Sequence, residues 1–287
     1  MQPQFFNVVN DELRSSSNIH RVTDPRTEEE LWPCPIATTQ DFEDAVAAAQ
    51  EAFKTWSLTT VEERQALLVK LADVIRDNAE ELASILMRET GKSKILADID
   101  VQAGIAQALY YSQNALTDEV QHEDEHQKVV ATHIPLGTVA AICPWNFPLI
   151  LSNIKVVSAL VTGNCVIVKP SPFTPYAVMK WAELSRGVLP PGVFQVLNAG
   201  ADLGAAMTAH PGIAKISFTG TIAVGKKVLA ACAPTLKKVT LELAGNNACV
   251  VCPDADLDRA VPASPAGPVL PILSASRAAR DPARQSR

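Results

Sequence analysis

The sequence predicts an α/β fold in which a parallel sheet is preceded by a helical segment. Three observations lead to this prediction. The 287 residues are 47% apolar and 20% charged, as in an ordinary globular protein that can bury a core. Residues 42–116 show the apolar periodicity of amphipathic helices. From Thr138 onward, short apolar runs alternate with helical segments, which is typical of βαβ units and a parallel sheet.

The beginning of the chain is predicted to be irregular. Residues 1–40 are rich in turn-forming residues, and Pro25, Pro33 and Pro35 interrupt any regular element. Four helices are expected next, the second opening with a Thr60–Glu63 capping box and the third with Asn78 as its N-cap. These helices begin near Phe42, Thr60, Asn78 and Ser93.

The alternating part of the chain supplies the predicted sheet. The expected strands cover residues 138–143, 164–169, 193–197, 215–219 and 238–243. The helices between them are expected over residues 148–162, 174–189, 202–209 and 222–231. Residues 248–252 are interpreted as a further short strand. Residues 262–287 are rich in Pro and Arg and keep no apolar period, so this tail is predicted to be disordered.

Charge and apolar pattern exclude several classes of protein. The net charge of −6 and the pI near 5.4 argue against nucleic-acid binding, which usually needs a basic face. The chain opens with no signal-peptide pattern. Residues 148–168 are apolar but contain Asn153, Lys155 and Asn164, which a bilayer span would not tolerate. We therefore expect a soluble, cytoplasmic protein with no membrane partner.

The cysteines and histidines give only weak signals for a metal. The six cysteines are scattered, mostly within apolar runs, and are expected to be reduced thiols. Cys249 and Cys252 form a single C-x-x-C without a second pair. Residues 122–126, His-Glu-Asp-Glu-His, fit the zinc-peptidase pattern H-E-x-x-H, but their surroundings are polar throughout and offer no helix face to bury. No metal site is predicted.

Four short motifs lie at or near the ends of predicted strands, where ligands of parallel sheets bind. Gly220 and Thr221 lead from a strand into a helix whose N-terminus could hold a phosphate, and Gly225 follows in that helix. Lys169 ends another strand and could reach a ribose or phosphate. Glu242 lies in an apolar strand, where burial would give it the pKa of a general base. Asn146, held between prolines and aromatic residues, could donate its amide to a developing oxyanion.

Together and in this order, the motifs resemble the aldehyde dehydrogenase superfamily. The resemblance covers roughly Asp24 to Val261 and implies a Rossmann-like cofactor-binding domain over residues 41–261. It also implies an oligomerisation hairpin at residues 117–135 and a homo-oligomeric protein. The segments that carry the resemblance are Pro144–Pro148, Lys169–Pro175, Phe218–Gly225, Leu241–Gly245 and Pro253–Leu257.

The resemblance implies a role for each matched residue. Asn146 and Glu242 would be catalytic, as the donor to the aldehyde oxygen and the general base for water. The cofactor would be NAD or NADP. Pro172 stands where NAD-preferring members often carry a glutamate, which makes NADP use plausible. The cofactor would contact Trp145, Lys155, Lys169, Gly220, Thr221, Gly225 and Leu243.

One departure from the family bears on activity. The family's nucleophilic cysteine is expected about thirty residues beyond the glutamate, but no cysteine follows Cys252 in this sequence. We therefore expect the family activity, oxidation of a small-molecule aldehyde to a carboxylic acid, but a truncated and inactive chain that lacks the catalytic domain and part of the oligomer interface. The alternatives are a non-catalytic nucleotide-binding homologue, or an unstable fragment from an altered reading frame.

Overall fold

The computed structural model describes residues 3–114, 116–245, 252–256 and 258. Residues up to Leu243 form one compact unit, and Ala244 begins a second. In the second unit the amide of Ala255 donates to the carbonyl of Cys252 at 3.0 Å. The predicted disordered tail, and the predicted strand at 248–252 apart from Cys252, lie outside the described residues.

A seven-stranded sheet forms the centre of the first unit, in the order β11-β10-β7-β8-β9-β1-β2. Five of these strands are parallel, and β1 and β2 add to one side as antiparallel strands. The parallel strands are β7 (Thr138–Ile142), β8 (Cys165–Lys169), β9 (Phe194–Val196), β10 (Lys215–Gly220) and β11 (Lys238–Leu243). The predicted α/β class and parallel sheet are confirmed.

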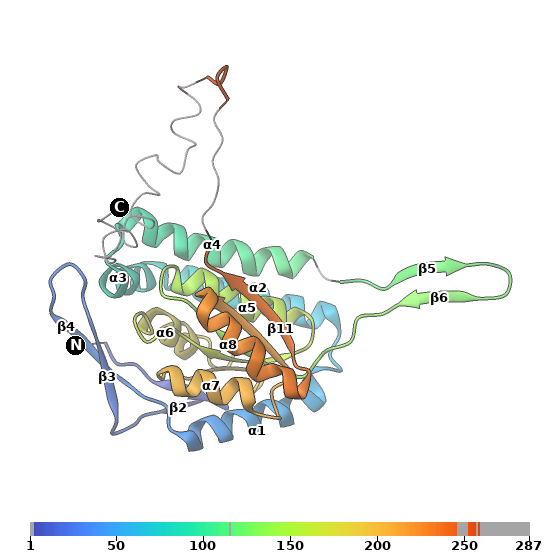
Figure 1. Ribbon diagram of the computed structural model, residues 1–287, viewed down its shortest axis with the longest axis horizontal. Helices are drawn as coiled ribbons and strands as arrows, with labels where there is room; N and C mark the ends of the chain where they lie inside the picture. Colours follow the sequence, from blue (N-terminus) through green and yellow to red (C-terminus); the bar gives the residue numbers. More distant parts are fainter. Residues whose placement is uncertain (1–2, 115, 246–251, 257, 259–287) are drawn as a thin grey trace. The chain divides into compact units, whose positions relative to one another are not determined.

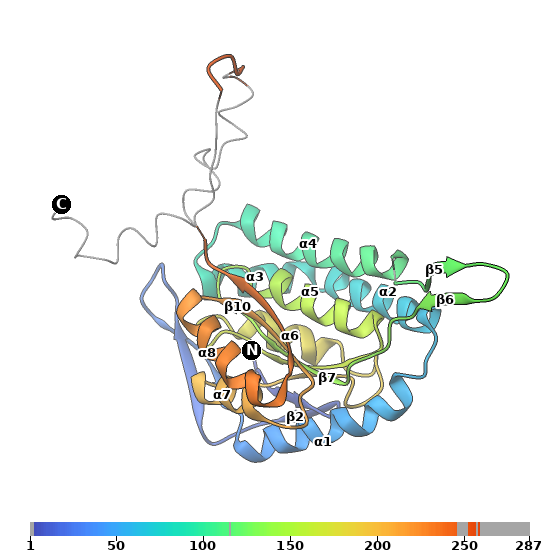
Figure 2. The same ribbon diagram turned by 45° about the vertical axis from the view of Figure 1, so that its right-hand side comes forward.

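Helices cover both faces of this sheet (Figures 1 and 2). On one face α5 (Pro148–Val161) packs on β7 and β8, and α6 (Tyr176–Leu184) packs on β9. The other face carries α1 (Thr39–Trp56), α7 (Ala201–Ala209) and α8 (Ile222–Cys232). Because both faces are covered, every residue of β7, β8 and β9 is buried.

Three further helices form a layer outside α5. They are α2 (Val61–Asp77), α3 (Ala79–Thr90) and α4 (Lys94–Gln113), and α4 packs on both α2 and α5. The Thr60–Glu63 capping box is present at the start of α2, as predicted. Asn78 is the N-cap residue of α3, as predicted, but its side chain makes no capping hydrogen bond. The Asn78 side chain donates back to the carbonyl of Val74 at 2.8 Å, so it completes the end of α2 and makes no cap to α3.

The prediction of an irregular segment over residues 1–40 is also wrong. This segment forms two strands of the main sheet, β1 (Asn7–Val9) and β2 (Glu12–Arg14), and a separate two-stranded sheet of β3 (Ile19–Thr23) and β4 (Glu30–Pro35). Pro33 and Pro35 pair with Arg21 and Ile19. Each strand of a two-stranded sheet has one open edge, which tolerates residues without an amide hydrogen.

A hairpin of β5 (Glu119–Glu123) and β6 (Lys128–Ala131) lies within the stretch where the family resemblance predicts one (residues 117–135) and projects away from the helices in Figures 1 and 2. Val120, Val129 and Val130 are exposed on it. Its function in oligomerisation stays a prediction. His122 lies in β5, and His126 in the turn, so the H-E-x-x-H pattern is not on a helix. In the described part of the chain, no helix is long and apolar enough to cross a membrane.

The turn before β9 passes close to the backbone of α1. Gly192 has a φ of +82°, and a Cβ placed on it would lie 2.5 Å from the carbonyl oxygen of Ala48. Gly187 has a similar φ of +74° but no atom within 4 Å of such a Cβ. Substitution of these two glycines therefore distinguishes the cost of backbone strain, which both positions share, from the cost of a steric clash, which only Gly192 would have.

Gly192→Ala is expected to lower the free energy of unfolding by about 3 kcal/mol or more, because strain and a clash with backbone add. Gly187→Ala, the matched control, is expected to cost only about 1 kcal/mol, for the left-handed conformation alone. Urea unfolding measures both. Equal losses in the two variants would contradict the close approach of Gly192 to α1.

Candidate functional site

The order of the parallel strands defines where a ligand would bind. The chain makes β7 first, adds β8 and β9 on one side of it, and then adds β10 and β11 on the other side. In such doubly wound sheets, ligands bind beyond the carboxyl ends of the strands, at the point where the direction of strand addition reverses. Here that point lies between β7 and β10.

Most of the predicted site residues gather at this edge of the sheet. Lys169 is the last residue of β8 and is paired with Ile142, the last residue of β7. Trp145 and Asn146 lie three and four residues beyond the end of β7 at Ile142. Gly220 ends β10 and is paired with Leu243, the end of β11.

The residues after β10 bring α8 close to β11. Thr221 is the N-cap of α8, and its hydroxyl accepts from the amide of Val224 at 3.4 Å. A Cβ placed on Gly225 would lie 2.6 Å from Cδ2 of Leu243, so only a glycine permits this packing without movement of Leu243. The N-terminus of α8, with its free amides and positive dipole end, is thereby fixed beside the strand ends.

Lys169 is a buried cation. Its residue is 5% exposed, and its ammonium donates to the carbonyl of Pro170 at 3.3 Å. Burial lowers the pKa of Lys169 to about 8, while the nearby Cys143 thiol acts in the opposite direction. In the described structure no carboxylate pairs with it. Such a group favours a ligand that supplies hydrogen-bond acceptors or negative charge.

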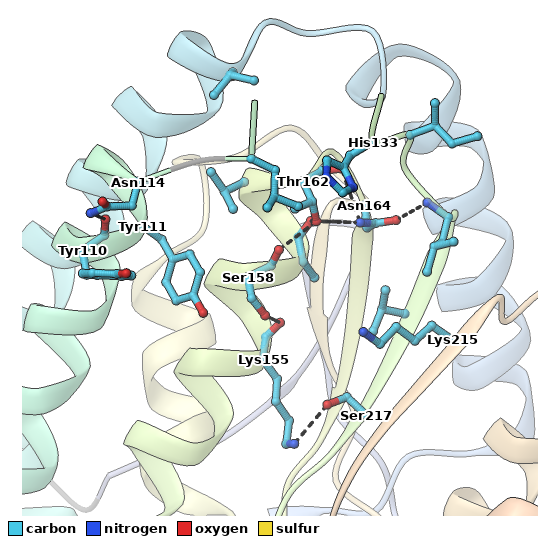
Figure 3. Close-up of a pocket in the computed structure, with 17 residues that line it drawn as sticks. Tyr110, Tyr111, Asn114, His133, Lys155, Ser158, Thr162, Asn164, Lys215 and Ser217 are labelled. Carbon is cyan, nitrogen blue, oxygen red and sulfur yellow. Dashed lines mark hydrogen bonds between the residues drawn. The ribbon is translucent and has the colours of Figure 1, made fainter. Parts of the chain in front are cut away.

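The structure places Lys155 against the middle of β10. It lies on α5, and its ammonium donates to the Ser217 hydroxyl at 3.0 Å. Burial lowers its pKa, and the Cys143 thiol and the Glu242 carboxylate act in the opposite direction. Lys155 lines a cavity of about 700 Å³, together with Lys215 of β10. Both residues are labelled in Figure 3. Of the predicted site residues, all of which the structure describes, only Lys155 lines this cavity.

The predicted burial of Glu242 is wrong. Glu242 lies in β11, which is the last strand of the sheet, and its side chain is exposed. A strand at the sheet edge has only one neighbouring strand, and α8 covers part of one face. The desolvation expected from its apolar neighbours in sequence is therefore not present among the described residues.

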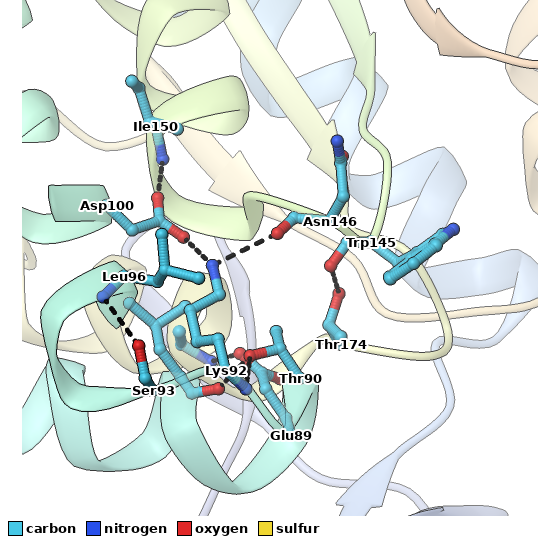
Figure 4. Close-up of polar contacts among 12 residues, drawn as sticks. Glu89, Thr90, Lys92, Ser93, Leu96, Asp100, Trp145, Asn146, Ile150 and Thr174 are labelled. Carbon is cyan, nitrogen blue, oxygen red and sulfur yellow. Dashed lines mark hydrogen bonds and ion pairs between the residues drawn. The ribbon is translucent and has the colours of Figure 1, made fainter. Parts of the chain in front are cut away.

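Asn146 is held through its backbone. Its carbonyl accepts from the ammonium of Lys92 at 3.1 Å, and the carbonyl of Trp145 accepts from Thr174 at 3.2 Å. Figure 4 shows the Asn146 side chain pointing away from these contacts. Lys92 was not predicted as part of the site, and neither was its ion-pair partner Asp100. A signal was available, because Asp100 occupies the same helical stripe as the buried residues Leu96, Gly104 and Ala108.

A doubly wound parallel sheet with polar groups and a helix N-terminus at its switch point defines an α/β protein of the dinucleotide-binding class. The comparison with known families is more specific. The chain belongs to the aldehyde dehydrogenase family, whose sequence model matches residues 13–269.

Relatives and solved structures agree with this assignment. An aldehyde dehydrogenase of a Fusarium species is 46% identical over 258 residues, which are 90% of this chain and 55% of that protein. A mitochondrial succinate-semialdehyde dehydrogenase of Arabidopsis thaliana is 39% identical over 84% of this chain and 47% of that protein. The chain thus spans about half the length of these relatives.

Solved structures are likewise similar over most of this chain and about half of the other chain. An NAD⁺ complex of a Bacillus cereus aldehyde dehydrogenase superposes with a TM-score of 0.86 at 32% identity, over 90% of this chain and 55% of that one. An NADP-dependent enzyme of Escherichia coli superposes with a TM-score of 0.85 at 29% identity, over the same shares of the two chains. The family uses both cofactors, and these comparisons do not select one for this chain.

Because of the Lys155–Ser217 contact, substitution of Ser217 is expected to lower the free energy of unfolding more than substitution of Ser158. Ser217→Ala removes a hydrogen bond to a buried ammonium and is expected to cost about 1.5–3 kcal/mol in unfolding free energy. Ser158→Ala, the control, removes only a local hydrogen bond from Ser158 to the carbonyl of Lys155 within α5 and is expected to cost less than about 1 kcal/mol. Urea unfolding at neutral pH compares them. A loss at Ser217 no larger than that at Ser158 would show that Lys155 does not depend on this contact.

Proposed function

We propose that residues 1–243 bind NAD or NADP as the cofactor-binding part of an aldehyde dehydrogenase, which oxidises an aldehyde to a carboxylic acid. The observation that carries the proposal is the meeting of Lys169, the Trp145–Asn146 segment and the N-terminus of α8 at one edge of the sheet. The family assignment and the similarity to cofactor-dependent dehydrogenases support it.

Each group has a chemical task in this proposal. Lys169 would donate to a ribose hydroxyl of the cofactor, and the amides of Gly220, Thr221 and the first turn of α8 would face its pyrophosphate. Gly225 and Leu243 would set the position of α8, and Trp145 would contact the cofactor from the loop after β7. Lys155 would lie beneath the cofactor, held by Ser217. When bound, the cofactor would accept a hydride from the substrate carbon.

Two residues would take part in the chemistry, one on the aldehyde and one on water. The side-chain amide of Asn146 would donate a hydrogen bond to the aldehyde oxygen, where negative charge develops. Glu242 would take a proton from the water that releases the acid. The exposure of Glu242 leaves its carboxylate accessible to water and to neighbouring groups. The family chemistry also needs a thiolate nucleophile, and the last two cysteines of this sequence lie within ten residues of Glu242.

The purified 287-residue chain is expected to bind NAD⁺ or NADP⁺ but to reduce neither in the presence of an aldehyde. Calorimetric titration measures binding, and absorbance of the reduced cofactor measures turnover. Lys169→Met is expected to weaken binding by about 10- to 100-fold, the value of a charge-assisted hydrogen bond. Lys54→Met, which removes an exposed lysine from α1, serves as the control. A chain that binds neither cofactor would contradict the proposal. Formation of reduced cofactor would mean that a residue of this chain serves as the nucleophile.

Binding is also expected to depend on pH through Lys169. Its pKa of about 8 means that the ammonium is charged below that pH and becomes neutral above it. Cofactor affinity should therefore be highest below pH 8 and should fall about tenfold by pH 10. Lys169→Arg keeps its charge over this range, so its affinity should change little. An affinity of the unmodified chain that is flat over the same range would contradict this function for Lys169.

A further inference from the structure

A buried ion pair contacts the backbone at Asn146 and at Ile150 (Figure 4). The ammonium of Lys92 lies 2.8 Å from Oδ2 of Asp100 and 3.1 Å from the carbonyl oxygen of Asn146. The other carboxylate oxygen of Asp100 accepts from the amide of Ile150 at 2.8 Å. One acid–base pair thus holds the carbonyl of Asn146 and an amide in the first turn of α5, so the short segment between them is fixed at both ends.

The surroundings of the pair restrict its motion. The side chains of Lys92 and Asp100 are 6% and 0% exposed. The Lys92 ammonium also lies 4.2 Å from the centroid of the Phe147 ring, within the range of a cation–π contact. Lys92 therefore contacts two successive residues of the loop after β7, whereas a surface lysine would leave that loop free.

Stability alone does not account for this arrangement. Desolvation of two charges offsets most of their attraction, so an apolar pair of similar size is often as stable as a buried ion pair. The distinctive result of this pair is geometric. With the carbonyls of Trp145 and Asn146 both engaged, the side-chain amide of Asn146 makes no hydrogen bond to any described residue and points away from the pair. The loop is held and the amide is left available to a ligand.

We propose that Lys92 and Asp100 are positioning residues for Asn146, which they aim by fixing its backbone. The inference rests on the proposed function of Asn146 as the donor to the aldehyde oxygen. Neither residue touches the reacting atoms. Their contribution is preorganisation, because a donor that must be reoriented during the reaction stabilises developing charge less well.

The test separates positioning from general stability through a double variant. Lys92→Met alone leaves the buried Asp100 carboxylate with the amide of Ile150 but without its counter-charge, and is expected to destabilise the whole chain. Lys92→Met combined with Asp100→Asn removes both charges, while the carboxamide introduced by the second substitution still offers an oxygen to the amide of Ile150. The double variant should melt within a few degrees of the unmodified chain, and it specifically lacks the donor to the carbonyl of Asn146.

Fluorine NMR of the full chain labelled with 5-fluorotryptophan reports on the loop. The four tryptophans are expected to give four resonances, and Trp145→Phe would assign the one next to Asn146. In the double variant we expect the Trp145 resonance to shift or broaden while those of the buried Trp56 and Trp181 stay in place. Lys94→Met, which removes a half-exposed lysine two residues from Lys92, should leave all four unchanged.

Two results would overturn the inference. The Trp145 resonance could stay unchanged in a double variant that melts cooperatively, or it could move only together with those of Trp56 and Trp181. The measurement needs neither cofactor nor turnover. A chain that fails to bind NAD or NADP would therefore count against the proposed function and would leave this test of the loop intact.

Discussion

The parallel pairing of β7 on both of its edges is the constraint on which the rest of the structure depends. All five residues of β7 are buried, and its neighbours β8 and β10 both run parallel to it. Parallel neighbours cannot be joined by a short turn, so α5 and α7 must cross the two faces of the sheet. The end of β7 is then the place where the two directions of strand addition meet. The loop from Cys143 to Phe147 lies there because of topology, before any side chain is considered.

Two buried lysines, one at this edge of the sheet and one against the middle of β10, indicate the kind of ligand that this part of the structure is suited to receive. Lys155 and Lys169 are each less than a tenth exposed, and burial lowers the pKa of both. Within the described residues, neither forms an ion pair; each donates only to an uncharged oxygen. A desolvated cation without a counter-charge costs free energy, and natural cores avoid it unless something offsets the cost. A ligand that carries phosphates and ribose hydroxyls would offset it, which agrees with the family of this chain.

The sequence predicted the sheet well and the polar details less well, for physical reasons. Strands such as residues 165–169 are buried on both faces, so their apolar runs are unambiguous. The strands of the first forty residues were missed because prolines suit the open edges of a two-stranded sheet, which no local pattern reveals. Glu242 was placed in a core on the same grounds that succeeded for β8, but β11 has only one strand beside it. Position within a sheet, which decides burial there, depends on residues far away in the chain.

The same reasoning explains why the sequence located Asn146 but not the residues that fix it. A motif places Asn146 after β7, since that requires only the order of elements along the chain. The direction of its amide depends on a contact with Lys92, 54 residues earlier, in the connection between α3 and α4. The one local trace of that contact is the carboxylate of Asp100 in the buried stripe of α4. A charged residue at such a position must have a partner, so buried charges on otherwise apolar faces are where a sequence indicates non-local polar contacts.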